Sequence, residues 1–252
     1  APAYRTATAA IAVSAVVLVA IGQSPLQVLA LLIKGAFGSA AGISYTLYYA
    51  TTFVFTGLAV AVAYHCGLFN IGAEGQAMMG GLGAALAALA LGPSAPAWLL
   101  LPAMVLAAIA LGVIWAAIPG ALQAWRGSHI VITTIMFNFI ASSVLNYLLV
   151  NTLKPKGQMD PATARFPEGA HLPTLHDLPL IGEVFDKNTP ANVSLFVALA
   201  ACVLVWLLIW RTRLGYMIRA FGKSEPAAVY AGISPTKIIL WSMLISGGLA
   251  GM

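Results

Sequence analysis

Apolar residues run through this chain in long stretches, and short polar segments separate them. Seven stretches can be drawn as membrane spans, at residues 7–21, 43–63, 72–91, 98–124, 129–151, 193–210 and 236–252. A helix needs about 20 mostly apolar residues to cross roughly 30 Å of hydrocarbon. The pattern therefore predicts an all-α fold, a polytopic transmembrane helical bundle.

Composition supports a membrane protein and excludes a nucleic-acid-binding one. Apolar residues make up 61% of the 252 residues and charged residues only 8%, against about 25% charged in a soluble domain. The formal net charge is +5, but the basic residues lie in short segments between apolar runs, where membrane topology explains them. We expect membrane lipid around the chain and no nucleic acid.

The basic residues also predict which side each segment faces. If the N-terminus is cytoplasmic, the inner side receives Arg5, Arg126, Arg211, Arg213, Arg219, Lys223 and Lys237. An excess of Lys and Arg marks cytoplasmic loops. This orientation makes residues 152–192 an extracytoplasmic loop and residues 211–235 a cytoplasmic one. The chain begins without Met and ends at Met252 without a polar tail, so we expect 1–252 to be one transmembrane domain of a longer polypeptide.

A polar and glycine-rich stretch, YHCGLFNIGAEGQAMMGG at 64–81, interrupts this apolar pattern. Its glycines are spaced too irregularly for one smooth helix face, so we expect a broken helix near residues 67–75. Such a break is tolerated at membrane depth only inside protein or beside a water-filled cavity. Asn70 is expected to cap a helix that begins near Ile71, with Glu74 in its first turn. Glu74 has two open roles, to stabilise the break or to contact a transported solute.

Three motifs carry a resemblance to a known family. GLFNIGAEGQ (67–76), RGSHIVITTIMFNFIA (126–141) and RTRLGYMIRAFGKSEPAAVYAGIS (211–234) occur in the order found in permease subunits of bacterial ABC importers for nucleosides and simple sugars. That group is related to the ribose and branched-chain amino acid permeases. The chain departs from the family at His129 and Ile130, where Glu-Val is usual. The resemblance implies further C-terminal spans.

The resemblance also implies partners and a place in the cell. It implies an ATP-binding subunit carrying ATP and Mg, a second permease subunit, identical or homologous, and an extracytoplasmic substrate-binding protein. It places the chain in the bacterial cytoplasmic (inner) membrane, as a multi-pass protein with a cytoplasmic N-terminus. The GKS triplet at 222–224 is no phosphate-binding loop, because position 217 is Met where that motif needs Gly. We therefore expect no enzyme activity and no cofactor in this chain.

A short helix is predicted within the cytoplasmic loop, residues 211–235. We name this loop the coupling segment. Ser224 is expected to cap it, Pro226 fits its first turn and Gly232 fits its end. A docking face of small residues is suited to a groove in a soluble partner, and the resemblance implies that this helix transmits movement from the ATPase. Alternatively, the helix lies on the bilayer surface against anionic lipid. The expected coupling residues are Ser224, Glu225, Pro226, Ala227, Ala228, Tyr230 and Gly232.

Polar residues within the spans give a candidate substrate path. One row recurs every four residues through Thr134, Asn138 and Ser142, and a second includes Tyr48 and Thr52. Stacking rings, hydroxyls and amides suit a nucleoside. Helix-to-helix hydrogen bonds and an interfacial aromatic belt are the alternatives. The complete predicted path is Asn70, Glu74, Gln76, Thr134, Asn138, Ser142, Tyr48 and Thr52.

The expected function is thus translocation of nucleosides or simple sugars by alternating access, driven by ATP hydrolysed in another subunit. The alternative is an ion-coupled secondary transporter or channel for a small polar solute, in which Glu74 and the histidines relay protons. Such a carrier needs titratable groups inside the spans, and only Glu74 fits that position. His171 and His176 lack a third spaced ligand, so no metal site is expected.

Overall fold

A computed structural model describes residues 2–92, 95–179, 182, 185 and 189–252 of the chain. Regular structure in these residues is helical, and a single isolated bridge pairs Thr174 with Asn192. The all-α prediction is confirmed. The α-helices are α1 (Pro2–Ala20), α2 (Pro25–Phe37), α3 (Ala40–His65), α4 (Ala73–Leu91), α5 (Ala97–Arg126), α6 (Ile130–Leu148), α7 (Ser194–Arg211), α8 (Arg213–Lys223), α9 (Glu225–Tyr230) and α10 (Pro235–Gly251).

Within the described residues, four helical segments are long and apolar enough to cross a membrane: Ala40–His65, Ala97–Arg126, Ile130–Leu153 and Ser194–Arg211. The third joins α6 to a π-helical turn, η1 (Leu149–Leu153). These four confirm the predicted spans at 43–63, 98–124, 129–151 and 193–210. The polytopic membrane class is therefore confirmed.

The other three predicted spans form helices that differ from simple membrane crossings. The first is part of a bent pair, Thr8–Ala20 with Pro25–Phe37, whose axes meet at 111°. The bend falls at a polar turn, where Pro25 cannot continue α1 but fits the first position of α2. Helix α4 carries Glu74, Gln76 and several glycines, which lower its hydropathy, and α10 has only 17 residues.

The chain divides into two compact units, each with its own packing. The first comprises residues 1–50 and 173–193. In it, Leu175, Phe185 and Ala191 form a small apolar cluster with Ile43 and Leu47 of α3. The backbone N–H of Ala191 donates to the buried hydroxyl of Ser44 at 3.1 Å. This part of the predicted outer loop is thus folded onto the beginning of α3.

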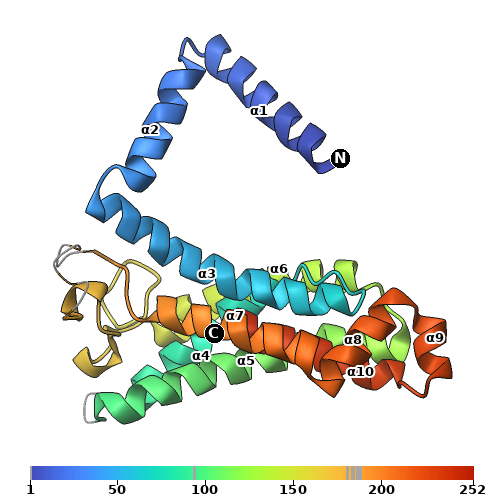
Figure 1. The fold of residues 1–252 in the computed structure, drawn as a ribbon. Helices are drawn as coiled ribbons and strands as arrows, with labels where there is room; N and C mark the ends of the chain where they lie inside the picture. Colours follow the sequence, from blue (N-terminus) through green and yellow to red (C-terminus); the bar gives the residue numbers. More distant parts are fainter. Residues whose placement is uncertain (1, 93–94, 180–181, 183–184, 186–188) are drawn as a thin grey trace. The chain divides into compact units, whose positions relative to one another are not determined.

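The second unit comprises residues 51–172 and 194–252 and holds three helices whose backbones come very close. Helices α4, α5 and α10 lie side by side (Figure 1). A Cβ placed on Gly112 would lie 2.9 Å from the Cα of Gly251, and one placed on Gly80 would lie 2.7 Å from the carbonyl carbon of Gly251. Real Cβ atoms do not approach so closely, so only glycine permits this packing. Gly251 of α10 is thus in close backbone contact with both α5 and α4.

The two predicted loops differ in how much helix they contain. Within 152–192, the described residues include two short 3₁₀ turns, η2 (Glu168–Ala170) and η3 (Leu175–Asp177). Residues 180–181, 183–184 and 186–188 of that loop lie outside the described residues. The coupling segment at 211–235 is mostly helical, because α8 precedes the expected short helix α9. Helix α8 was not predicted from the sequence.

Candidate functional site

A non-helical break separates α3 from α4 in the second unit. Helix α3 ends at His65 and α4 begins at Ala73, so the break comprises residues 66–72. Gly67 has φ +76°, a conformation that glycine adopts without strain. The predicted break near 67–75 is confirmed, although its last three residues belong to α4. The expectation of a helix starting near Ile71 was wrong by two residues.

Asn70 fixes the break from inside. Its side chain is only 1% exposed, and its Oδ1 accepts the backbone N–H of Gly72 at 2.9 Å. Its amide donates to Gln76 Oε1 at 3.1 Å and to Ser246 Oγ on α10 at 2.9 Å. The residue at the N-cap of α4 is Gly72, so Asn70 does not cap the helix as predicted. It makes a local turn two residues earlier, a bond that asparagine forms readily.

Helix α6 supports the same break from another direction. Asn138 Oδ1 accepts the backbone N–H of Gly75 at 2.9 Å, and its amide donates to the carbonyl of Ile71 at 3.0 Å. Thr134 is fully buried and donates to Ile130 O of its own helix at 2.7 Å. Ser142, one turn further, is exposed. The predicted row on α6 therefore leaves the packed interface after Asn138.

Glu74 differs from its neighbours because its side chain is exposed on this chain. It lies in the first turn of α4, as predicted, where the helix dipole favours a carboxylate. We expected protein to enclose it, and that holds for the backbone but not for the carboxylate. The amide and hydroxyl groups of Asn70, Gln76, Asn138 and Ser246 hydrogen-bond to one another or to backbone. The exposed Glu74 carboxylate takes no part in these bonds.

The second predicted row does not join the network at the break. Tyr48 is exposed and makes an edge-to-face contact with Tyr49 in the first unit, with ring centroids 5.5 Å apart. Thr52 is exposed and lines a pocket of about 130 Å³ with Thr51, Phe55 and Thr56 in the second unit. No residue of the break lines that pocket. The rows thus supply separate polar surfaces.

The coupling segment contains the predicted short helix, α9. Ser224 Oγ accepts the N–H of Ala227 at 3.4 Å, Pro226 lies in the first turn, and Gly232 follows the end with φ +81°. These three predictions are confirmed. The predicted docking face requires a correction, because Ala228 is 3% exposed and packs into the core, whereas Tyr230 is 97% exposed.

The coupling segment touches the break directly. A Cβ placed on Gly67 would lie 3.4 Å from the Cα of Gly222, and one placed on Gly222 would lie 2.9 Å from the backbone N of Gly67. Ala228 shares an apolar cluster with Cys66 and Leu68 of the break. Close backbone contact and a shared apolar cluster thus join the coupling segment to the break.

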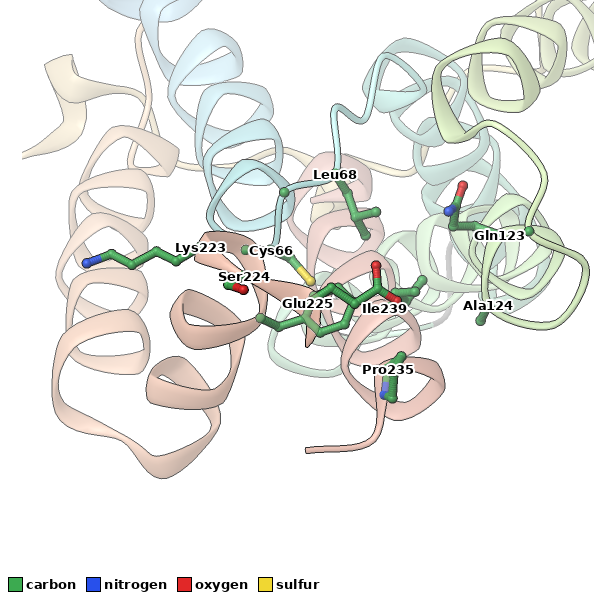
Figure 2. Close-up of a pocket in the computed structure, with 13 residues that line it drawn as sticks. Cys66, Leu68, Gln123, Ala124, Lys223, Ser224, Glu225, Pro235 and Ile239 are labelled. Atoms are coloured by element: carbon green, nitrogen blue, oxygen red, sulfur yellow. The ribbon is translucent and has the colours of Figure 1, made fainter. Parts of the chain in front are cut away.

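A pocket of about 490 Å³ lies between these two elements. Figure 2 shows Cys66 and Leu68 of the break beside Ser224 and Glu225 of the coupling segment, with Lys223 pointing away. Gln123 and Ala124 at the end of α5 and Pro235 and Ile239 of α10 also line it. Gln123 Oε1 has no hydrogen-bond partner in the described chain. Space next to the contact leaves room for the coupling segment to shift.

Sequence reasoning missed the α10 hydroxyl, that of Ser246, which completes the network. Ser246 is fully buried and donates to Ala59 O at 2.7 Å while it accepts from Asn70. Ser242, one turn earlier, is also fully buried. The two serines are four residues apart, as are Gly247 and Gly251 next to them. This spacing is typical of the face of a helix that packs against other helices. That spacing was the signal available in the sequence.

Comparisons with known proteins agree with this architecture. The family model described as branched-chain amino acid transport system / permease component matches residues 42–252. The guanosine ABC transporter permease protein of Bacillus subtilis is 36% identical over 96% of this chain and 67% of its own length. The nucleoside ABC transporter permease protein of Lactococcus lactis is 33% identical over 94% of this chain and 65% of its own.

A third relative carries a different cargo in its name. The glucose ABC transporter permease protein of Haloferax volcanii is 35% identical over 98% of this chain and 64% of its own length. The chain thus spans about two thirds of the length of these relatives. No solved structure matches it significantly. The matched region includes the break, its supports on α6 and α10, and the coupling segment, so the chain belongs to the permease component family of branched-chain amino acid transport systems.

Proposed function

We propose that this chain is the membrane-spanning permease subunit of an ATP-driven importer whose cargo is a nucleoside. Family membership and the relatives named for guanosine and nucleoside transport support this proposal. The single observation that carries it is the contact between Gly222 of the coupling segment and Gly67 of the break. That contact links a cytoplasmic helix to a polar interruption in the membrane-spanning part.

The proposed partner subunits would supply the ATP hydrolysis and the substrate capture that this chain is not expected to perform. The GKS triplet at 222–224 falls at the end of α8 and the start of α9, without the strand that a phosphate-binding loop requires. The ATP and Mg would therefore reside in a separate ATP-binding subunit. The exposed Tyr230 on α9 is suited to insert into that subunit. A second permease subunit and an extracytoplasmic substrate-binding protein would complete the importer.

In a transporter that works by alternating access, the predicted site residues would have different roles. Asn70, Gln76, Thr134 and Asn138 are buried or part-buried in the supports of the break, so their role is to hold its shape. Glu74 is exposed and unpaired in the described chain, so its role is to face the solute or a neighbouring subunit. Ser142 and Thr52, both exposed in the second unit, would line the route more loosely. A transport route should bind weakly enough to release its cargo.

Orientation is part of the proposal. The N-terminus is placed on the cytoplasmic side of the bacterial inner membrane, which puts α8 and α9 on that side as well. The excess of Lys and Arg in residues 211–223 supports this arrangement. A cysteine introduced at Glu168 should then be labelled by an impermeant reagent without permeabilising the membrane.

Uptake into proteoliposomes tests the proposal. The chain would be reconstituted with its ATP-binding and second permease subunits, and labelled guanosine would be supplied with its binding protein. Uptake should require ATP and should persist when a protonophore dissipates the pH gradient. Uptake driven by a pH gradient without ATP would instead indicate an ion-coupled carrier. Preference for glucose over guanosine would reassign the cargo, as the Haloferax volcanii relative allows.

A further inference from the structure

Another pocket, of about 700 Å³, lies at the end of α7, and no residue of the break lines it. It is formed by the last residues of α7, the outer side of α8 and the turn that follows α9. The residues that line it are Trp210, Arg211, Thr212, Arg213, Tyr216, Met217, Arg219, Ala231, Gly232 and Ile233. None of its lining residues carries an acidic side chain, so three arginines give this pocket a strong positive charge.

Aromatic rings and backbone hold two of these arginines in place. The guanidinium of Arg219 lies 4.5 Å from the centre of the Trp210 ring, and its Nε donates to Ile209 O at 3.0 Å. The guanidinium of Arg211 lies 5.6 Å from the centre of the Trp206 ring. Stacking orients both guanidinium groups, and the backbone bond also holds Arg219. Neither charge is neutralised by an acidic side chain in the part of the chain that the structure describes. Such a pocket is preorganised for an anion.

The position of the pocket indicates which kind of anion it binds. Helix α7 is a membrane-spanning candidate that ends at Arg211, and Trp206, Trp210 and Tyr216 are exposed near this end. Exposed Trp and Tyr at the end of a span mark the level of the lipid headgroups. Helix α8 buries Gly215, Ile218 and Phe221 on its inner face, so the arginines between α7 and α8 lie at that level.

We propose that this pocket binds the phosphate of an anionic phospholipid headgroup, such as that of phosphatidylglycerol. Arginine pairs with phosphate through two parallel hydrogen bonds, and basic pockets at the membrane surface bind anionic headgroups. The lipid would tie the end of α7 to α8 and to the turn after α9.

Nanodiscs containing the purified chain alone test this binding. Native mass spectrometry and thermal unfolding would compare discs of phosphatidylcholine with discs that also contain phosphatidylglycerol. Phosphatidylglycerol should bind and raise the unfolding temperature. The double variant Arg211→Gln with Arg213→Gln should bind it about thirtyfold more weakly, at about 1 kcal/mol for each arginine. The matched control is Arg126→Gln, at the end of α5 and outside this pocket, which should bind as the wild type does.

Three results would overturn the proposal. Equal lipid binding by the double variant and the wild type would show that the lipid binds elsewhere. Inorganic phosphate that stabilises the chain in pure phosphatidylcholine as well as the lipid does would indicate a site for a free anion. An effect of the double variant that appears only with the ATP-binding subunit present would assign the arginines to an acidic partner surface. Because these experiments measure lipid binding and unfolding and not uptake, their results are independent of whether the chain imports nucleosides.

Discussion

Asn138 on α6 hydrogen-bonds both to Gly75 in the first turn of α4 and to Ile71 in the break before it. Its Oδ1 accepts from Gly75 N at 2.9 Å, and its amide donates to Ile71 O at 3.0 Å. The first N–H groups of a helix have no partner within that helix, and lipid offers none. One side chain thus satisfies a donor of α4 and an acceptor of the break.

Replacing Asn138 with Leu should destabilise the chain. The variant leaves one buried N–H and one C=O unpaired, each costing about 1–3 kcal/mol. Thermal unfolding in detergent or nanodiscs should show a clear decrease in midpoint. Asn146→Leu is the matched control, because Asn146 is exposed two turns further along the same helix. Equal midpoints for the two variants would mean that the Asn138 bonds add nothing to stability.

The glycine contact between α5 and α10 should tolerate no side chain. In Gly112→Val the new Cβ would lie 2.9 Å from Gly251 Cα, and overpacking of this kind costs about 1–3 kcal/mol or more. We expect a lower unfolding midpoint and less folded protein in the membrane. Gly81→Val introduces the same side chain into a helix where nothing lies within 4 Å, so it should be well tolerated. A Gly112→Val chain as stable as Gly81→Val would refute this close packing.

Cys66 in the break should react slowly with thiol reagents. Its side chain is only 1% exposed, so a reagent reaches the thiol only when the packing around the break opens. Maleimide labelling of a Cys202→Ser chain would measure this, with the denatured chain as the control for full reactivity. Labelling of the folded chain as fast as the denatured one would contradict a buried break.

Glu74→Gln should separate stability from transport. The carboxylate is exposed and unpaired in the described chain, so its loss removes only a dipole interaction of about 0.3–1 kcal/mol. We expect an almost unchanged unfolding midpoint and a reduced rate of uptake, because the group faces the solute or a neighbouring subunit. Gln76→Leu is the contrasting variant, since it breaks a buried hydrogen bond with Asn70. A normal rate of uptake by Glu74→Gln would mean that the carboxylate only stabilises the start of α4 and takes no part in transport.

The sequence predicted the class of fold, four spans, the break and α9 because each depends on local features. Apolar length predicts a span, and Ser224, Pro226 and Gly232 define the ends of a short helix on their own. The partners of Asn70 were not predictable in this way, because Ser246 lies 176 residues away in the chain. Helix α8 was missed because its apolar residues form a one-sided stripe rather than a continuous run.

The exposure of Glu74 also lay beyond the sequence. Its neighbours Gly75 and Gln76 are buried, and only the rotation of α4 against α5, α6 and α10 decides which of these positions faces outward. The residues of a local motif do not determine how the helix is rotated against its neighbours. The inward position of Ala228 on α9 was missed for the same reason.

The central claim is that the coupling segment drives the break through Gly222 and Gly67. Its most direct test is the number of guanosine molecules imported per ATP hydrolysed by the reconstituted importer carrying Gly222→Ala, whose Cβ would lie 2.9 Å from Gly67 N. ATP hydrolysis should continue while this ratio decreases about tenfold, as expected for a lost coupling free energy of about 1.4 kcal/mol. A Gly222→Ala importer that hydrolyses ATP and imports guanosine at the wild-type ratio would contradict the account.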